Sequence, residues 1–331
     1  MPMQAIIQHR YGTPDDLRLM EVEIPVPKPN EVLVKIHAAA VNDWELGLLE
    51  GKPLFMRLFL GLFRPKVKIM GCEIAGVIES VGGDIARFKP GDKVYGDLSA
   101  SSFGAFAEYV CAREDAVMHM PSNLSFEQAA AIPHAAMLAQ QALQDIAGMQ
   151  QGQSLLINGA GGGVGTLAVQ MAKLHKLGVT GVDSTAKQEY MTLLGFDRVI
   201  DYLQEDFTRT GKQYDLILDT KTSRSPFDYA RALKPGGTYV TVGGSMPRVL
   251  QCLVFAKWIS MTQKKTLRVL ALKPNKGLNH FTGLIEAGKI LPAIDSRFPL
   301  AEVPQALKHF ASARHKGKVI ISVASATDYD A

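Results

Sequence analysis

The stretch Ser154-Leu155-Leu156-Ile157-Asn158-Gly159-Ala160-Gly161-Gly162-Gly163-Val164-Gly165 decides the fold of this chain, because an apolar run ends there in a glycine-rich turn. Apolar positions over residues 166–176 recur at the spacing of one helix face, so the order is strand, turn, helix. Backbone N–H groups and the positive end of a helix dipole meet at such a turn, where a diphosphate can bind without a cationic side chain. Ala160, Gly162 and Gly165 keep the spacing of the dinucleotide fingerprint, with alanine replacing its first glycine.

A glycine-rich turn alone is common and could be an ordinary loop between a strand and a helix. Residues 178–183 add a second apolar strand, and its acidic end, Asp183, lies 18 positions after Gly165, near the expected ribose contact. Together these features predict a βαβ unit that binds a nicotinamide or flavin dinucleotide.

Length and composition describe an ordinary globular protein. The 331 residues are enough for two domains, and hydrophobic and charged residues make up 47% and 21% of them. The formal charge of +4 is small and the basic residues look dispersed, so we do not expect nucleic acid as a partner. The three cysteines are far apart and odd in number, which favours a reducing compartment over disulfides.

The chain shows no targeting or spanning segment. Its first residues lack the charged start and apolar core of a signal peptide, so the cytosol is the default location. Residues 53–70 are apolar but are interrupted by Arg57, Gly61, Arg64 and Pro65, and residues 249–261 are too short and contain Lys257. Neither stretch is expected to cross a membrane.

The pattern of predicted elements changes along the chain. Residues 5–120 read as short strands broken by prolines and glycines, which predicts a β-rich, partly closed barrel. Ser125 and Gln128 form a possible capping box before a helix. From Ser154 to about residue 292 strands and helices alternate, which predicts a parallel sheet covered on both faces. The tail ends in a further helix and strand.

Seven short segments, spread in order over nearly the whole chain, share the pattern of one known family: residues 11–17 (YGTPDDL), 40–44 (AVNDW), 71–77 (GCEIAGV), 88–94 (FKPGDKV), 159–165, 199–202 (VIDY) and 317–320 (GKVI). On these segments the chain resembles the medium-chain dehydrogenase/reductases, in their zinc-independent, quinone-oxidoreductase-like branch.

The resemblance implies a mixed α/β protein with three parts. These are a GroES-like, β-rich catalytic domain over residues 1–125, a Rossmann domain with a doubly wound parallel sheet over residues 126–292, and a segment over residues 293–331 that returns to the catalytic domain. It also implies hydride transfer from NAD(P)H to a small hydrophobic quinone or α,β-unsaturated carbonyl. It leaves a homodimer open.

The ligand positions of the family's zinc-dependent members are altered. Asn42 replaces a metal-binding cysteine, and Cys72 replaces the histidine of a Gly-His-Glu motif. Catalytic zinc takes about three protein ligands, for which Cys72, Glu73 and His134 are a conceivable but atypical set. Three cysteines cannot form a four-cysteine structural zinc lobe, so no metal is expected.

Without a metal, the protein must position the acceptor and stabilise negative charge on its oxygen. Asn42 matches the family's active-site asparagine and could donate a hydrogen bond, or it could only cap a loop. Asp43 is expected to orient that loop, and Trp44 is either a stacking wall or a buried aromatic. His134 could donate a proton near neutral pH or serve structure alone.

Three neighbouring residues give opposite indications about the coenzyme. Asp183 would accept hydrogen bonds from the ribose of NADH and repel a 2′-phosphate. Ser184 and Lys187, however, resemble the phosphate-binding tetrad of NADPH-using relatives. The resemblance favours NADPH slightly. Further contacts are expected at Tyr202 and Thr220 near adenosine, and at Gly243, Gly244, Leu270 and Ala271 near the nicotinamide.

Two apolar insertions, residues 53–70 and 246–262, could form a lid, a substrate wall, a dimer surface or core. The sequence therefore predicts a zinc-free, NAD(P)H-dependent reductase of quinones or enones. A zinc-free alcohol, aldehyde or enoyl-thioester reductase is the nearest rival. A nucleotide-binding sensor without turnover is the alternative from another class.

Overall fold

The computed structural model describes residues 2–323, which divide into two compact units. The first unit runs to His134 and includes Lys273–Glu286 and the segment from Pro292 onward, and the second holds Ala135–Leu272 and Ala287–Leu291. The first boundary thus lies later than the expected residue 125. The helix α3 (Phe126–Ala130) packs on strands of the first unit, and α9 (Leu278–Glu286) joins it through the hydrogen bond between Tyr95 and Thr282.

The second unit is built on six parallel strands in the order β10-β9-β8-β11-β12-β13. Their bounds are Ser154–Asn158 (β8), Gly178–Asp183 (β9), Arg198–Asp201 (β10), Tyr214–Asp219 (β11), Leu233–Thr241 (β12) and Thr266–Val269 (β13). The order reverses between β8 and β11. This confirms the doubly wound sheet predicted from the alternation of elements.

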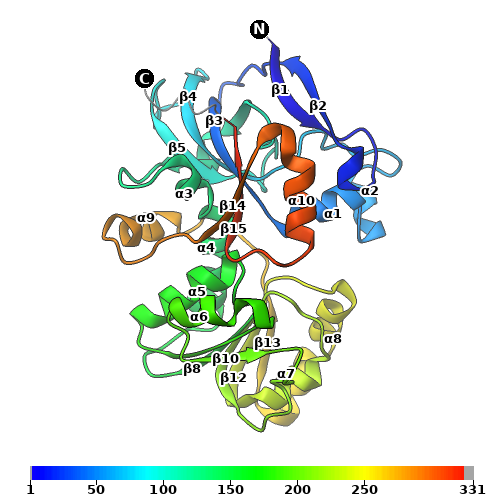
Figure 1. Ribbon diagram of the computed structural model, residues 1–331, viewed down its shortest axis with the longest axis vertical. Coiled ribbons are helices and arrows are strands. Elements are labelled where there is room, and N and C mark those ends of the chain that lie inside the picture. Colours follow the sequence, from blue (N-terminus) through cyan, green and yellow to red (C-terminus); the bar gives the residue numbers. More distant parts are fainter. Residues whose placement is uncertain (1, 324–331) are drawn as a thin grey trace. The chain divides into compact units, whose positions relative to one another are not determined.

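Helices connect these parallel strands and cover the sheet. Figure 1 shows α5 (Gly163–Leu174) and α6 (Gln188–Leu193) on one face, and α7 (Pro226–Ala232) and α8 (Met246–Gln263) on the other. Crossovers on the two sides of the reversal must run over opposite faces, because each is right-handed. The carboxyl ends of β8 and β11 therefore open a crevice where a ligand can bind.

Close packing explains the glycines of the β8–α5 turn. A Cβ on Gly165 would lie 2.3 Å from the carbonyl oxygen of Ala160. Gly159 has φ +81°, and a Cβ there would lie 2.1 Å from Oγ1 of Thr220. A side chain at either position would push the turn away from its neighbours, so only glycine fits there.

The first unit holds a seven-stranded sheet and a two-stranded one. The large sheet has the order β14-β15-β3-β4-β5-β7, with β6 paired to β3, and β1 pairs with β2. The bounds are Pro2–Ile7 (β1), Arg18–Glu23 (β2), Glu31–Val41 (β3), Glu73–Val81 (β4), Lys93–Asp97 (β5), Tyr109–Arg113 (β6), Met118–His119 (β7), Ile294–Pro299 (β14) and Lys318–Ser322 (β15). The tail adds a strand to this sheet, because β15 pairs antiparallel with β3.

Short helices flank the sheet of the first unit: α1 (Asp43–Glu50), α2 (Arg57–Leu60), α3, α9 and α10 (Val303–Ala311). The predicted capping box begins α3, since Ser125 N donates to Gln128 Oε1 at 3.0 Å and Gln128 N donates to Ser125 Oγ at 3.2 Å. The helix α4 (Pro133–Gln140) begins at the unit boundary and continues as a π-helical turn over Gln141–Ile146.

Both apolar insertions are largely exposed, although each also contributes to a core, for example through Met70 and Ile259. Six large apolar side chains within residues 54–63 are half or more exposed, with Phe63 at 85%, and α8 exposes Val254 at 72% and Met261 at 76%. The rest of α8 packs inward through Val249, Cys252 and Ile259. Among the described residues, no helix is long and apolar enough to cross a bilayer.

Candidate active site and dinucleotide site

The residues proposed for the coenzyme gather at one edge of the second unit's sheet. Each follows the carboxyl end of a strand, where a doubly wound sheet binds its ligand. Residues 160–165 follow β8, Asp183, Ser184 and Lys187 follow β9, Tyr202 follows β10, Thr220 follows β11, Gly243 and Gly244 follow β12, and Leu270 and Ala271 follow β13. The fold thus brings the whole predicted set to one edge, although its members lie over a hundred positions apart.

Asp183 and Lys187, the two residues with opposite implications for the coenzyme, form an ion pair with each other. Lys187 Nζ lies 3.4 Å from Asp183 Oδ1, and both side chains are buried. The same carboxylate accepts hydrogen bonds from Gly161 N and Ser184 N, each at 2.9 Å. It therefore ties the glycine turn to the end of β9, and the lysine neutralises part of its charge.

A buried carboxylate at the end of β11 was not among the predicted site residues. Asp219 is fully buried and accepts hydrogen bonds from Asn158 Nδ2 at 2.8 Å and from the hydroxyl of Tyr239 at 2.9 Å. Burial raises its pKa above the ordinary value of an aspartate. The signal in the sequence is the acidic residue that ends the apolar run Leu216–Leu218, the same signal that identified Asp183.

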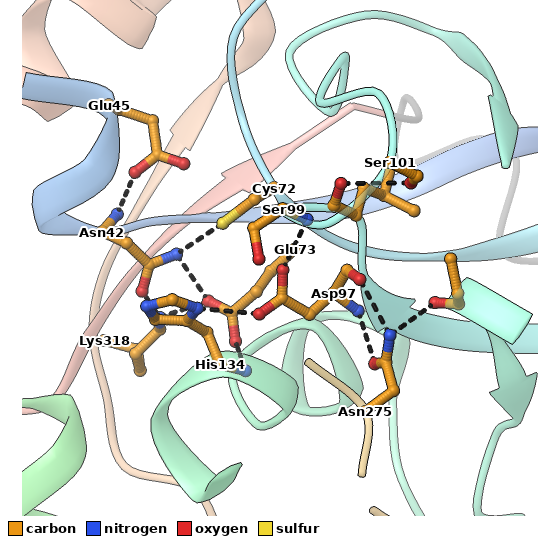
Figure 2. Close-up of polar contacts among 12 residues, drawn as sticks. Asn42, Glu45, Cys72, Glu73, Asp97, Ser99, Ser101, His134, Asn275 and Lys318 are labelled. Atoms are coloured by element: carbon orange, nitrogen blue, oxygen red, sulfur yellow. Dashed lines mark hydrogen bonds and ion pairs between the residues drawn. The ribbon is translucent and has the colours of Figure 1, made fainter. Parts of the chain in front are cut away.

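The first unit contains a second cluster of polar side chains, built by strand register (Figure 2). Glu73 at the start of β4 faces Ala40 of β3 on one side and Asp97 of β5 on the other. Val319 of β15 faces Val41, so Lys318 and Asn42, the next residues, also meet at this end of the sheet. The cluster therefore forms where four neighbouring strands begin or end.

Lys318 and Glu73 form the centre of this cluster. Lys318 Nζ donates to Glu73 Oε2, and the two side chains are 5% and 0% exposed. The same ammonium donates to Asn42 Oδ1 at 2.6 Å, and Asn42 Nδ2 donates to Glu73 Oε2 at 2.8 Å. Asn42 is thereby held between a cation and an anion. Its remaining N–H points to the weak acceptor Cys72 Sγ at 3.5 Å.

His134, at the start of α4, makes one hydrogen bond with its backbone and one with its side chain. Its backbone N donates to Glu73 Oε1 at 2.7 Å, and its Nδ1 lies 2.8 Å from Asp97 Oδ2. Burial opposes a charge on the imidazole, but the hydrogen bond to Asp97 and the charges of Asp97 and Glu73 outweigh it, so the pKa of His134 is raised. The same hydrogen bond lowers the pKa of Asp97 despite its burial.

Glu45 of α1 adds a carboxyl that the sequence reading missed. Its Oε2 accepts the backbone N–H of Asn42 at 2.7 Å, which closes the first turn of α1. Its Oε1 is buried and has no hydrogen-bond partner within the described residues. Complete burial raises the pKa of Glu45 to about 7, so this carboxyl takes up or releases a proton near neutral pH.

The other two predicted residues of this loop lie outside the cluster. Asp43 and Trp44 are both exposed, Trp44 at 44%, so the reading of Trp44 as a buried aromatic is wrong. Asn42 directly precedes α1, as the loop-capping interpretation expected, and its side chain also belongs to the buried cluster.

Comparisons with known proteins agree with this architecture. The family model described as an alcohol dehydrogenase GroES-like domain matches residues 28–122, and the one described as a zinc-binding dehydrogenase matches residues 194–321. A 2-methylene-furan-3-one reductase from Solanum lycopersicum is 32% identical over 96% of this chain and 79% of its own length. A chloroplastic quinone-oxidoreductase homolog from Spinacia oleracea is 31% identical over 96% of this chain and 98% of its own length.

A solved structure supports the same assignment. The quinone oxidoreductase from Coxiella burnetii superimposes with a TM-score of 0.86 at 28% identity, covering 98% of this chain and all of that chain. The resemblance drawn from the seven sequence segments is thus confirmed over nearly the full length. The chain belongs to the medium-chain dehydrogenase/reductase superfamily, in its quinone-oxidoreductase-like branch.

Proposed function

We propose that this protein is an NAD(P)H-dependent reductase of small quinones or α,β-unsaturated carbonyl compounds. The observation that carries the proposal is the buried His134–Asp97 pair, because its imidazole Nε2 has no hydrogen-bond partner within residues 2–323. The names of the tomato and spinach relatives and of the Coxiella structure support the substrate class. When bound, the nicotinamide coenzyme supplies the hydride.

The residues of the cluster then have separate roles in this proposal. His134 holds a proton at Nε2 and gives it to the reduced acceptor, while Asp97 fixes the ring through Nδ1. Asn42 turns its second N–H from Cys72 to the acceptor oxygen, where charge develops. Asp43 and Trp44, which are exposed, shape the loop that carries Asn42.

We also propose that the reaction uses no zinc. Cys72, Asp97 and His134 offer ligand atoms within 4.8 Å of one another. The 2.8 Å between Asp97 Oδ2 and His134 Nδ1, however, is a hydrogen-bond distance, shorter than the roughly 3.3 Å that separates two ligands around a tetrahedral zinc. Asp97 Oδ1 and both oxygens of Glu73 accept other hydrogen bonds. With these bonds kept, Cys72 and the imidazole Nε2 remain, fewer than the three protein ligands of a catalytic site.

For the coenzyme we favour NADPH, with NADH as the alternative. The ion pair with Lys187 reduces the negative charge that Asp183 would present to a 2′-phosphate. Lys187 also lies beside the glycine turn, and Ser184 N donates to the same Asp183 carboxylate as Gly161 N. A 2′-phosphate would need cationic and hydrogen-bonding groups of this kind. This preference rests on charge and on family resemblance.

We place the protein in the cytosol, since Cys72, Cys111 and Cys252 are all free. Fractionation of the source cells tests this location. A homodimer stays a prediction, which measurement of the mass in solution would decide.

A coenzyme titration followed by an acceptor panel tests the proposed function. NADPH fluorescence should change on binding, and quinones or enones should oxidise it faster than saturated aldehydes do. Metal analysis of the same preparation should find well under one zinc per chain. Oxidation by aldehydes or acyl thioesters alone would favour the rival reductases, and binding without oxidation by any acceptor would favour a sensor.

Two substitutions separate the roles within the cluster. His134→Gln should lower turnover about a hundredfold. Asn42→Ala should also lower turnover, and its affinity for the coenzyme should stay unchanged. The raised pKa of His134 means that the wild-type rate is full at low pH and declines as pH rises through that pKa, and this decline should vanish in His134→Gln.

His309→Gln is the matched control, because His309 Nε2 makes a comparable 2.7 Å contact with Asp295 away from the cluster. It should keep both the rate and the pH profile. If His134→Gln retains the wild-type profile, the proton does not come from His134, and unchanged turnover in Asn42→Ala would remove Asn42 from the reaction.

Coenzyme preference is tested at Asp183. Asp183→Ser should raise the ratio of NADPH to NADH affinity by about tenfold, since a carboxylate repels the 2′-phosphate. Asp197→Ser is the control, because Asp197 also accepts a backbone N–H, from Val179, and pairs with Lys173. The control should leave the ratio unchanged. An unchanged ratio in Asp183→Ser would mean that Asp183 does not face the ribose.

A further inference from the structure

Exposed apolar side chains of this protein are concentrated in two short segments. Of the 23 large hydrophobic side chains that are exposed in the described chain, 13 lie in residues 54–63 or in α8. The loop surface consists of Leu54, Phe55, Leu58, Phe59, Leu62 and Phe63, and the α8 surface of Met246, Leu250, Leu253, Val254, Phe255, Trp258 and Met261. Patches of this kind on a folded protein mark a binding surface.

Both segments are also cationic and contain no acidic residue. Residues 51–72 and residues 235–272 each hold five lysines or arginines and none of the 32 aspartates and glutamates of the chain. Arg64, Lys66 and Lys68 are exposed beside the loop surface, and Lys257, Lys264 and Arg268 are exposed in and after α8. The basic residues are therefore less dispersed than the sequence reading concluded.

The α8 surface is held firmly by the rest of its unit. Val249, Cys252 and Ile259 anchor the inner side of the helix, and the seven apolar side chains of the α8 surface stay exposed on it. The ring of Trp258 packs edge-on against Phe227 with 5.5 Å between centroids, yet the residue stays 52% exposed. A helix that is apolar on both sides is stable in water only where both are covered.

The loop surface is held at its base. Arg57 donates to the carbonyls of Gly51 and Glu50, both at 3.0 Å, and its guanidinium lies 4.3 Å from the centroid of the Tyr11 ring. The Tyr11 hydroxyl in turn donates to Gly61 O at 2.6 Å. Arg57, the one polar residue of residues 54–63, is thus engaged in these contacts. Phe59 and Phe63 stay exposed, at 70% and 85%.

We propose that the loop surface and the α8 surface each bind the headgroup region of a bilayer that contains anionic phospholipids. Exposed aromatic and aliphatic side chains enter the boundary between headgroups and acyl chains, and flanking lysines and arginines pair with lipid phosphates. Because neither segment contains a carboxylate, an anionic membrane does not repel them.

Vesicle flotation tests this proposal on the full chain. The protein should float with vesicles of phosphatidylcholine and 30% phosphatidylglycerol at least about tenfold more strongly than with phosphatidylcholine alone, and raising the salt from about 0.1 to 0.5 M should reverse most of the difference. The chain has two tryptophans, so Trp44→Phe leaves Trp258 as the only one. Its emission should shift to the blue on binding and be quenched by brominated acyl chains.

Matched substitutions assign the binding to the two surfaces. Trp258→Glu and Phe63→Glu should each weaken partition by about tenfold. Leu193→Glu is the control, because Leu193 is 81% exposed and lies outside both surfaces, and it should keep partition within about twofold. Equal binding to neutral and acidic vesicles, no flotation, or equal losses in all three variants would overturn the proposal. A dimer that Trp258→Glu dissociates, without vesicle binding, would show that a second copy covers α8 instead.

Discussion

The buried ion pair between Lys318 and Glu73 is the interaction on which the first unit's site depends. Two charges removed from water are stable only if their remaining hydrogen-bonding capacity is also used. Here Glu73 accepts the ammonium, the Asn42 amide and the backbone N–H of His134, and Lys318 also donates to Asn42. The pair therefore fixes both groups that we propose to act on the acceptor.

This interaction also explains why the tail of the chain returns to the first unit. Lys318 begins β15, which pairs with β3, and the cation thus arrives about 245 positions after the anion it neutralises. Without β15, Glu73 would be a buried carboxylate facing Asp97 on the next strand, an arrangement that costs several kcal/mol. The C-terminal strand is in this sense part of the site as well as of the sheet.

The carboxyl groups around this pair differ in their environments, and so in their charge. Asp97 is held ionised by the hydrogen bond from His134, whereas Glu45, with one oxygen unpartnered, has its pKa raised to about 7 by burial. Neighbouring acids with separated pKa values are typical of sites that move protons. The cluster can thus exchange a proton near neutral pH without breaking its central ion pair.

Local patterns predicted the second unit and the start of α3 well, because a glycine turn, strand ends and a capping box are each set by residues close in sequence. Asp183 and Lys187 were found this way, but their ion pair was not, since the sequence does not give side-chain direction. Asp97 and Lys318 lay beyond prediction from pattern, because β-sheet register joins residues from four strands that are distant in sequence. Glu45 was missed although it stands three positions after Asn42, which is the spacing of a capping box. The helix α8 was also missed, since its apolar residues are not confined to one side and so do not recur at a clear helical period.

A double-mutant cycle between Lys318 and Glu73 tests the central claim most directly. Free energies of unfolding would be measured by urea denaturation for Lys318→Met, Glu73→Gln and the double variant. Each single change should cost about 3 kcal/mol because it leaves one buried charge unpaired, and the double variant should recover about 2 kcal/mol of the summed cost. Additive costs, with no recovery in the double variant, would contradict the account that this ion pair organises the site.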